Sequence, residues 1–304
     1  MDVNALKYLV TQSFAEWRED NASRLSAALA YYTIFSIPPL LIIAIAIASQ
    51  LFDRAAVQQQ VVDQISGLVG DSGAEVVESI LENSSGSEET AVAAIISVVT
   101  LLLGASGVFG ELHNALNTIW EVKAKPGRGI WGTIKDRFFS FTMVLGVGFL
   151  LLVSLIISAG LAAVNEFISG VMPSFVTLAQ VINFLVSFGI ITVLFGLIYK
   201  VVPDVKVAWR DVWIGAVVTA FLFTVGKFAI GLYLGNSAPG STYGAAGSLI
   251  VLLLWVYYSA QILFFGAEFT QVYANKYGSR IVADEDAVAL SPEAQPAPGV
   301  SANK

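Results

Sequence analysis

The 304-residue sequence contains no cysteine, only one histidine (His113), and only 13% charged residues. The absence of cysteine excludes disulfides, thiolate metal sites and cysteine nucleophiles. A lone histidine without Asp, Glu or His residues clustered around it argues against a metal site. Charged residues are about half as frequent as in an ordinary soluble domain. The net charge of −7 weighs against a nucleic-acid partner.

Long apolar runs dominate the sequence, in which 56% of the residues are hydrophobic. The run at 27–49 carries no formal charge, and as a helix it would be ~35 Å long, enough to cross a bilayer core of ~30 Å. Further runs lie at 90–110, 138–164, 177–199, 212–234 and 243–270. The runs are too long and too uniformly apolar for a β-barrel. They predict an all-α polytopic membrane protein with six transmembrane helices.

Lysine and arginine are distributed unequally between the two sides of the predicted helices. Fourteen of the sixteen fall before the first span or after the second, fourth and sixth. Arg54 alone falls on the other side, and Lys227 lies within a span. Because cytoplasmic loops carry the excess of basic residues, we expect both termini to be cytoplasmic.

Three segments flank or interrupt the predicted membrane domain at 24–273. In residues 1–23, apolar residues recur at helical spacing: Val3, Leu6, Val10, Phe14 and Trp17. This pattern favours an amphipathic helix that either lies on the membrane or packs without lipid contact. Residues 274–304, rich in proline and alanine, predict a disordered cytoplasmic tail.

The loop at 52–89 carries Arg54 against eight acidic residues. Two amphipathic helices are predicted in it, separated by a turn at 70–73. The acidic surface is either an ordinary solvated extracytoplasmic cap or a surface that attracts cations.

Four stretches resemble the YihY / virulence factor BrkB family of bacterial inner-membrane proteins. They are Arg24–Leu40 (RLSAALAYYTIFSIPPL), Ala105–Val122 (ASGVFGELHNALNTIWEV), Pro203–Gly215 (PDVKVAWRDVWIG) and Gly226–Ala274. The resemblance implies a six-helix protein of the inner membrane. It also brings a historical ribonuclease BN label, widely regarded as a misassignment, and links to serum resistance, transport and envelope lipids.

Lys227 is the most anomalous residue, since it lies about 15 residues, or ~22 Å by helical rise, into the fifth span. A charge inside a membrane is costly and usually faces the bundle or water. Lys227 is therefore predicted either to bind a substrate anion or carry a proton, or to snorkel toward the outer interface.

Polar residues of spans one and six suggest a cavity between these spans that opens inward. They are Tyr31, Tyr32 and Ser36, which precede Pro38-Pro39, together with Tyr257 and Gln261 on one helix face. Because proline removes a backbone donor, the pair Pro38 and Pro39 is expected to break the first span. Broken helices around a cavity are typical of transporters. The alternative is a kinked helix whose tyrosines hydrogen-bond across a packed interface.

Four further charged residues are predicted near the inner surface: Arg24, Glu111, Arg137 and Glu268. We expect them to form a structural ion network, with a coupling site as the alternative.

The leading functional hypothesis is a non-ATP transporter or envelope-lipid-handling protein, because no phosphate-cradling glycine loop and no Ser-His-Asp arrangement occur. Its partners would be membrane lipids and an anionic lipid or ion substrate, without a cofactor. The alternative is a scaffold or assembly factor that acts through the acidic loop. A membrane-bound ribonuclease is disfavoured, since positive-inside topology already accounts for the basic segment 123–137. Nothing in the sequence specifies an oligomeric state.

Overall fold

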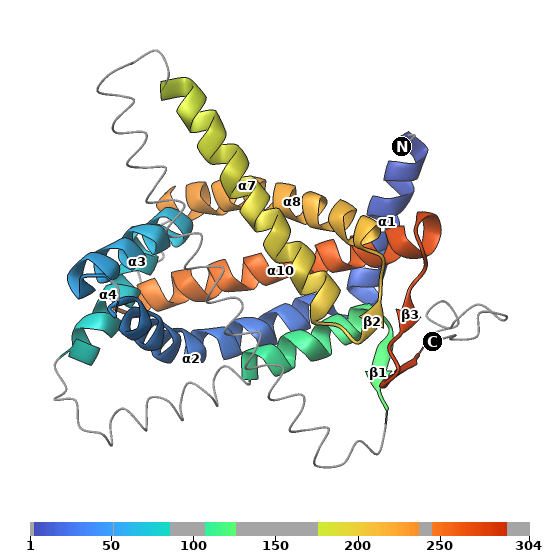
Figure 1. Cartoon of the computed structure of the whole chain (residues 1–304), viewed down its shortest axis with the longest axis horizontal. Coiled ribbons are helices and arrows are strands. Elements are labelled where there is room, and N and C mark those ends of the chain that lie inside the picture. Colours follow the sequence, from blue (N-terminus) through green and yellow to red (C-terminus); the bar gives the residue numbers. More distant parts are fainter. Residues whose placement is uncertain (1–2, 51, 86–106, 126–175, 237–244, 291–304) are drawn as a thin grey trace. The chain divides into compact units, whose positions relative to one another are not determined.

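The computed structural model describes residues 3–50, 52–85, 107–125, 176–236 and 245–290 (Figure 1). These ranges are mostly helical, which confirms the predicted class. The helices are α1 (Val3–Glu19), α2 (Ala22–Ala48), α3 (Arg54–Val69), α4 (Asp71–Ser85), α7 (Val176–Val201), α8 (Trp209–Asn236) and α10 (Ala245–Tyr277), with a further helical stretch over 107–119. The strands are β1 (Val122–Ala124), β2 (Val205–Lys206), β3 (Val282–Ala283) and β4 (Ala287–Ala289).

Three helices of the described part are long and apolar enough to cross a membrane: Val181–Val201, Trp209–Ile230 and Gly247–Tyr277. They overlap the predicted fourth, fifth and sixth spans. Helix α2 covers the predicted first span. Most of the predicted second span and all of the third lie outside the described residues, so the six-span topology and the cytoplasmic termini stay predictions.

Pro38-Pro39 does not interrupt α2, which is one helix where we expected a break. Ile34 and Ile37, on the turn before the prolines, pack on the apolar core that α2 shares with α10. Packing of an apolar face supplies most of the stability of a helix in a protein, and it can outweigh the ~3 kcal/mol helix penalty of a proline. The Ser36 hydroxyl also donates a hydrogen bond to the Tyr32 carbonyl, at 2.8 Å.

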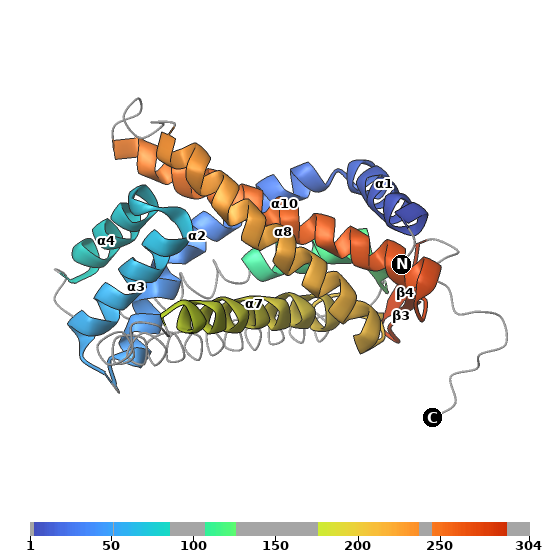
Figure 2. The ribbon, with the colours of Figure 1, turned by 90° about the horizontal axis from the view of Figure 1, so that it is seen from above.

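The acidic segment after α2 folds into a helical hairpin, as the sequence predicts (Figure 2). Asp53 caps the start of α3, because its carboxylate accepts a hydrogen bond from the Ala56 N–H at 3.0 Å. Gly70 separates α3 from α4 with φ of 87°, a backbone conformation in which a side chain would be strained. The turn therefore consists of one residue, whereas the sequence predicts a turn of four residues at 70–73.

The chain divides into two compact units. Unit 1 comprises Met1–Phe14, Leu116–Phe221 and Gly266–Lys304, and unit 2 comprises Ala15–Ala115 and Leu222–Phe265. The core of unit 2 joins α2 to α10 through buried Ala30, Val251, Leu252 and Val256. Ile65 of α3 and Val76 of α4 pack on the same cluster, so the hairpin is anchored on α2 and α10.

In unit 1, α8 and α10 approach closely because each has a glycine opposite a threonine of the other. A Cβ on Gly215 would lie 1.7 Å from Thr270 Oγ1, and one on Gly266 would lie 1.9 Å from Thr219 Oγ1. Each threonine hydroxyl donates to the carbonyl of the glycine four residues earlier in its own helix, at 2.8 Å for Thr219 and 2.6 Å for Thr270. The Tyr199 hydroxyl of α7 lies 3.0 Å from Thr219 Oγ1. We call the two glycines, the two threonines and Tyr199 together the glycine–threonine contact.

Residues 278–290 are ordered, where the sequence predicts a disordered tail from 274 onward. Gly278 closes α10 by donating its N–H to two carbonyls of the last turn, and β3 and β4 follow. The buried side chains of Ile281 and Ala287 anchor the segment. The composition of the tail does not reveal these contacts, because the pairing strands lie far away in the sequence. Residues 291–304 lie outside the described residues.

Gly215→Ala should destabilise the protein by about 1–3 kcal/mol, because the new methyl group overlaps Thr270 and forces α8 and α10 apart. Thermal unfolding of the purified protein in detergent measures the effect. Gly189→Ala in α7 is the matched control, since no described atom lies within 4 Å of the added Cβ. Equal melting temperatures for the two variants would contradict the close contact.

Candidate functional site

Two short antiparallel strand pairs lie at the end of unit 1 where α7 and α10 finish and α8 begins. β1 pairs with β4 in the register Val122↔Ala289, and β2 pairs with β3 in the register Val205↔Ala283. The pairs join the segments that follow residues 107–119, α7 and α10. We call residues 122–125, 202–208 and 278–290 the strand cap.

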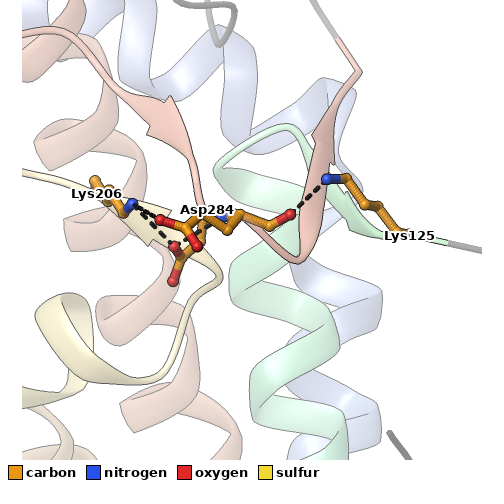
Figure 3. Close-up of polar contacts among 4 residues, drawn as sticks. Lys125, Lys206 and Asp284 are labelled. Atoms are coloured by element: carbon orange, nitrogen blue, oxygen red, sulfur yellow. Dashed lines mark hydrogen bonds and ion pairs between the residues drawn. The ribbon is translucent and has the colours of Figure 1, made fainter. Parts of the chain in front are cut away.

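Lysine side chains hold the turn between β3 and β4 in the strand cap (Figure 3). Lys206 Nζ lies 3.3 Å from Glu285 Oε1 and 3.4 Å from Asp284 Oδ1. Lys125 Nζ donates a hydrogen bond to the backbone carbonyl of Glu285. The turn is thereby tied to both β2 and the end of β1.

Hydrogen bonding to Glu285, with a smaller contribution from Asp284, raises the pKa of Lys206 above its usual value. A lysine whose pKa is raised on folding contributes stability below its unfolded pKa and loses it as pH rises through its folded pKa. The contact is therefore intact at neutral pH and lost only in alkaline solution. Because Lys206 is exposed, water and salt screen this contribution.

Two buried polar contacts attach the strand cap to the helices. Asn117 Oδ1 accepts a hydrogen bond from the Asp204 N–H at 2.8 Å, and Asn117 Nδ2 donates to Asp204 Oδ2 at 3.1 Å. Asp211, in the first turn of α8, accepts hydrogen bonds at 2.8 Å from both the N–H and the hydroxyl of Ser279, just after α10. Asn117 and Asp211 are 6% and 3% exposed.

Sequence reasoning does not single out Asn117, Asp204 or Asp211. A signal for them exists, since all three lie in the stretches Ala105–Val122 and Pro203–Gly215 that carry the family resemblance. Each is a polar residue among apolar ones near the end of a predicted span, which is where buried polar contacts between segments are needed.

Glu268 is fully buried in α10, inside the span Gly247–Tyr277. A carboxyl group in a span almost always faces the bundle interior or water rather than lipid, and the burial of Glu268 agrees with this. Arg24 and Glu111 lie in unit 2 and Glu268 lies in unit 1, while Arg137 falls outside the described residues. The predicted inner-edge ion network therefore stays a prediction.

The residues expected to line a cavity between spans one and six all lie in unit 2. Tyr31 and Tyr32 are 59% and 41% exposed, and their rings meet edge-on at 5.7 Å between centroids. Ser36 is buried, whereas Pro38 and Tyr257 are half-buried. The Gln261 Oε1 atom is buried without a hydrogen-bond partner in the described part of the chain. The cavity itself stays a prediction.

Lys227 is half-buried on α8, inside the span Trp209–Ile230. It follows Gly226, on which a Cβ would lie 2.5 Å from the Tyr258 hydroxyl and 2.8 Å from Ile262 Cδ1 of α10. Lys227 therefore lies next to a close approach of α8 and α10 in unit 2.

No group of three His, Asp or Glu side chains placed to hold a metal ion occurs within the described ranges. His113 is half-buried in the helical stretch 107–119. The expectation that the protein uses no cofactor stays a prediction.

The profile of a family described as virulence factor BrkB matches residues 13–290 of this chain. The chain belongs to the BrkB family. The match ends at the last residue of the strand cap, so the cap is part of the region that the BrkB profile covers. This confirms the family resemblance that the sequence motifs indicate.

Curated relatives of this BrkB-family chain are named UPF0761 membrane proteins. One from Mannheimia succiniciproducens is 27% identical over 280 residues, which cover 88% of this chain and 90% of the relative. One from Cronobacter sakazakii is 31% identical over 279 residues, covering 88% and 89%. One from Pseudomonas aeruginosa is 30% identical over 254 residues, which are 82% of this chain and 58% of the relative. No solved structure matches the chain.

Asn117→Ala should destabilise this BrkB-family protein by about 1–3 kcal/mol, because it leaves the Asp204 N–H without its acceptor. Thermal unfolding in detergent measures the loss. Lys123→Ala, at an exposed position of β1, is the control and should unfold near the wild-type temperature. If both variants unfold alike, the Asn117 contact does not hold the strand cap.

Proposed function

We propose that this membrane protein is a non-ATP transporter or envelope-lipid-handling protein that engages an anionic group through Lys227. The observation that carries the proposal is the position of Lys227, half-buried within a membrane span, on the flank of α8 that packs on α10. Membership of a family of membrane proteins agrees with this function.

The two flanks of α8 differ strongly around Lys227. Phe228 is 71% exposed and Val225 is 52% exposed, so one flank is apolar and open. On the other flank, the Phe223 ring meets the Trp255 ring of α10 edge-on, with 6.2 Å between centroids. At ~100° per residue, Lys227 lies about 160° around the helix from Val225 but only about 40° from Phe223. This position supports a protein-facing lysine over one that snorkels from the lipid side.

The charge of Lys227 has no acidic partner among the described residues. A lone ammonium at this depth costs ~2.5–3.5 kcal/mol on insertion scales. An anionic group, such as the phosphate of a lipid or an inorganic anion, offsets that cost, because opposite charges attract strongly where the dielectric constant is low. The ligand class that fits Lys227 is therefore an anion.

The alternative of a ribonuclease has weaker support. Its RNA path would run along the basic segment 123–137, but Lys125 is engaged by the Glu285 carbonyl in the strand cap. We accordingly propose that the protein is not an enzyme and that nucleic acid is not a partner.

A scaffold or assembly function is the second candidate, supported by the α3–α4 hairpin. Glu75, Glu78 and Glu82 are exposed and lie at i, i+3 and i+7, which puts three carboxylates on one face of α4. Val77 and Leu81 of the same helix are buried. The acidic face is thus held on a folded support, which suits a basic partner protein.

Lys227→Met tests the leading proposal, because it keeps the length and apolar stem of the side chain and removes the charge. We expect the variant to insert and fold normally but to fail to complement a null strain, with partial rescue by Lys227→Arg. Val225→Met on the exposed flank of α8 is the matched control and should complement fully. Full activity of Lys227→Met at native expression would refute the proposed role of Lys227.

Replacing Glu75, Glu78 and Glu82 together by Gln distinguishes the two functions. The change removes three charges and keeps residues that favour a helix. If the protein works through Lys227, complementation should be unaffected. A loss of complementation with unchanged helix content, measured by circular dichroism, would instead favour the scaffold function.

A further inference from the structure

Helix α1 carries an exposed apolar stripe beside a buried contact. Val3 is 79% exposed, Leu6 51%, Val10 45% and Phe14 51%. Their spacing of three, four and four residues puts them on one face of the helix. Leu9, on the neighbouring face, is fully buried. The helix is therefore fixed to the protein along one face while an apolar face remains uncovered by the described residues.

In unit 1, Leu9 belongs to one buried apolar cluster with Phe269, Val272 and Tyr273 of α10. Ile214 and Val218 of α8 pack against this cluster. The contact is reinforced at the end of α10, where Lys276 Nζ lies 4.8 Å from the centre of the Tyr8 ring. These contacts join α1 to two helices that are long and apolar enough to span a membrane.

The level of this contact along the spanning helices gives the depth of α1. Ile214 and Val218 lie about 7–14 Å along α8 from Trp209, its first residue, at ~1.5 Å per residue. Phe269 and Tyr273 lie about 6–12 Å along α10 from Tyr277, its last residue, by the same rise. Amphipathic helices of the membrane interface bury their apolar face ~5–10 Å into the boundary between headgroups and acyl chains. With the ends of α8 and α10 taken as the headgroup level, both ranges overlap that depth.

Aromatic residues at the same helix ends mark the headgroup level. Trp209, Trp213 and Tyr277 are 45%, 38% and 47% exposed. The Lys200 ammonium lies over the Trp209 ring, 5.8 Å from its centre. Exposed Trp and Tyr with neighbouring lysine are typical of the interface between lipid and water.

We infer that α1 is an in-plane membrane anchor whose stripe of Val3, Leu6, Val10 and Phe14 lies among the acyl chains of the leaflet where α8 begins and α10 ends. Its partner is the surface of a bilayer that contains anionic phospholipid. Lys7 is exposed and lies about 40° around the helix from Val3, at the edge of the stripe, where its ammonium reaches headgroup phosphates. This role is independent of Lys227 and of what the protein transports or assembles.

The absence of cysteine makes the anchor directly testable. Three single-cysteine variants of the full-length protein are each labelled with bimane. Two of them, Val10→Cys and Leu6→Cys, lie on the stripe, and the control, Thr11→Cys, lies on the exposed polar flank. The proteins are reconstituted into vesicles of phosphatidylethanolamine and phosphatidylglycerol. We expect labels at Val10 and Leu6 to show blue-shifted emission, quenching by doxyl groups on the lipid chains, and loss of quenching by iodide. The label at Thr11 should be quenched by iodide.

Three results would overturn the inference. Iodide quenching at Val10 and Leu6 equal to that at Thr11 would place the stripe in water. Protection from both quenchers, with energy transfer between labelled copies, would assign the stripe to a second copy of the chain. Protection from both quenchers without such transfer would place the stripe inside the protein.

Discussion

Unit 1 depends on the glycine–threonine contact between α8 and α10. Two apolar helices gain no hydrophobic free energy by leaving lipid for each other, so close packing and hydrogen bonds must hold them together. Gly215 and Gly266 allow the two backbones to approach, and the threonine opposite each of them fills the space. Both hydroxyls are satisfied within their own helices, so the close approach leaves no buried donor without an acceptor.

Other features of unit 1 follow from this contact. The antiparallel pairing of α8 and α10 brings the first turn of α8 beside the end of α10, where Asp211 can accept hydrogen bonds from Ser279. Ser279 begins the segment that forms β3 and β4, so the same pairing directs that segment toward β2 and β1. Leu9 fits against side chains that both helices contribute, and α1 is held where the two helices are already packed.

Features that depend on a repeated pattern within one segment could be predicted from the sequence. Apolar runs located the spans that α7, α8 and α10 provide, and amphipathic spacing located the α3–α4 hairpin. Features that depend on distant partners could not be predicted. Asn117 and Asp204 are 87 residues apart, and neither is distinctive in its own segment. At Pro38-Pro39 the local signal was strong but misleading. The two prolines predicted a break in the helix, and packing of α2 overrides that preference. For Lys227, the length of the apolar run predicts a depth in the membrane, but only the neighbouring side chains define its flank of α8.

The pairing of β1 with β4 also constrains the order in which parts of the protein can fold. Lys125 and Glu285, which meet at this pairing, are 160 residues apart in the chain. Contacts between such distant residues form slowly, since a long loop must close first. The two helices of the α3–α4 hairpin are neighbours in the sequence and can pair early, although their packing on α10 comes later. The strand cap, in contrast, must wait until residues 278–290 are synthesised. Until then, final partners are missing for the segments that follow residues 107–119 and α7, and for the first turn of α8. The folding of unit 1 is therefore completed only when residues 278–290 take their place.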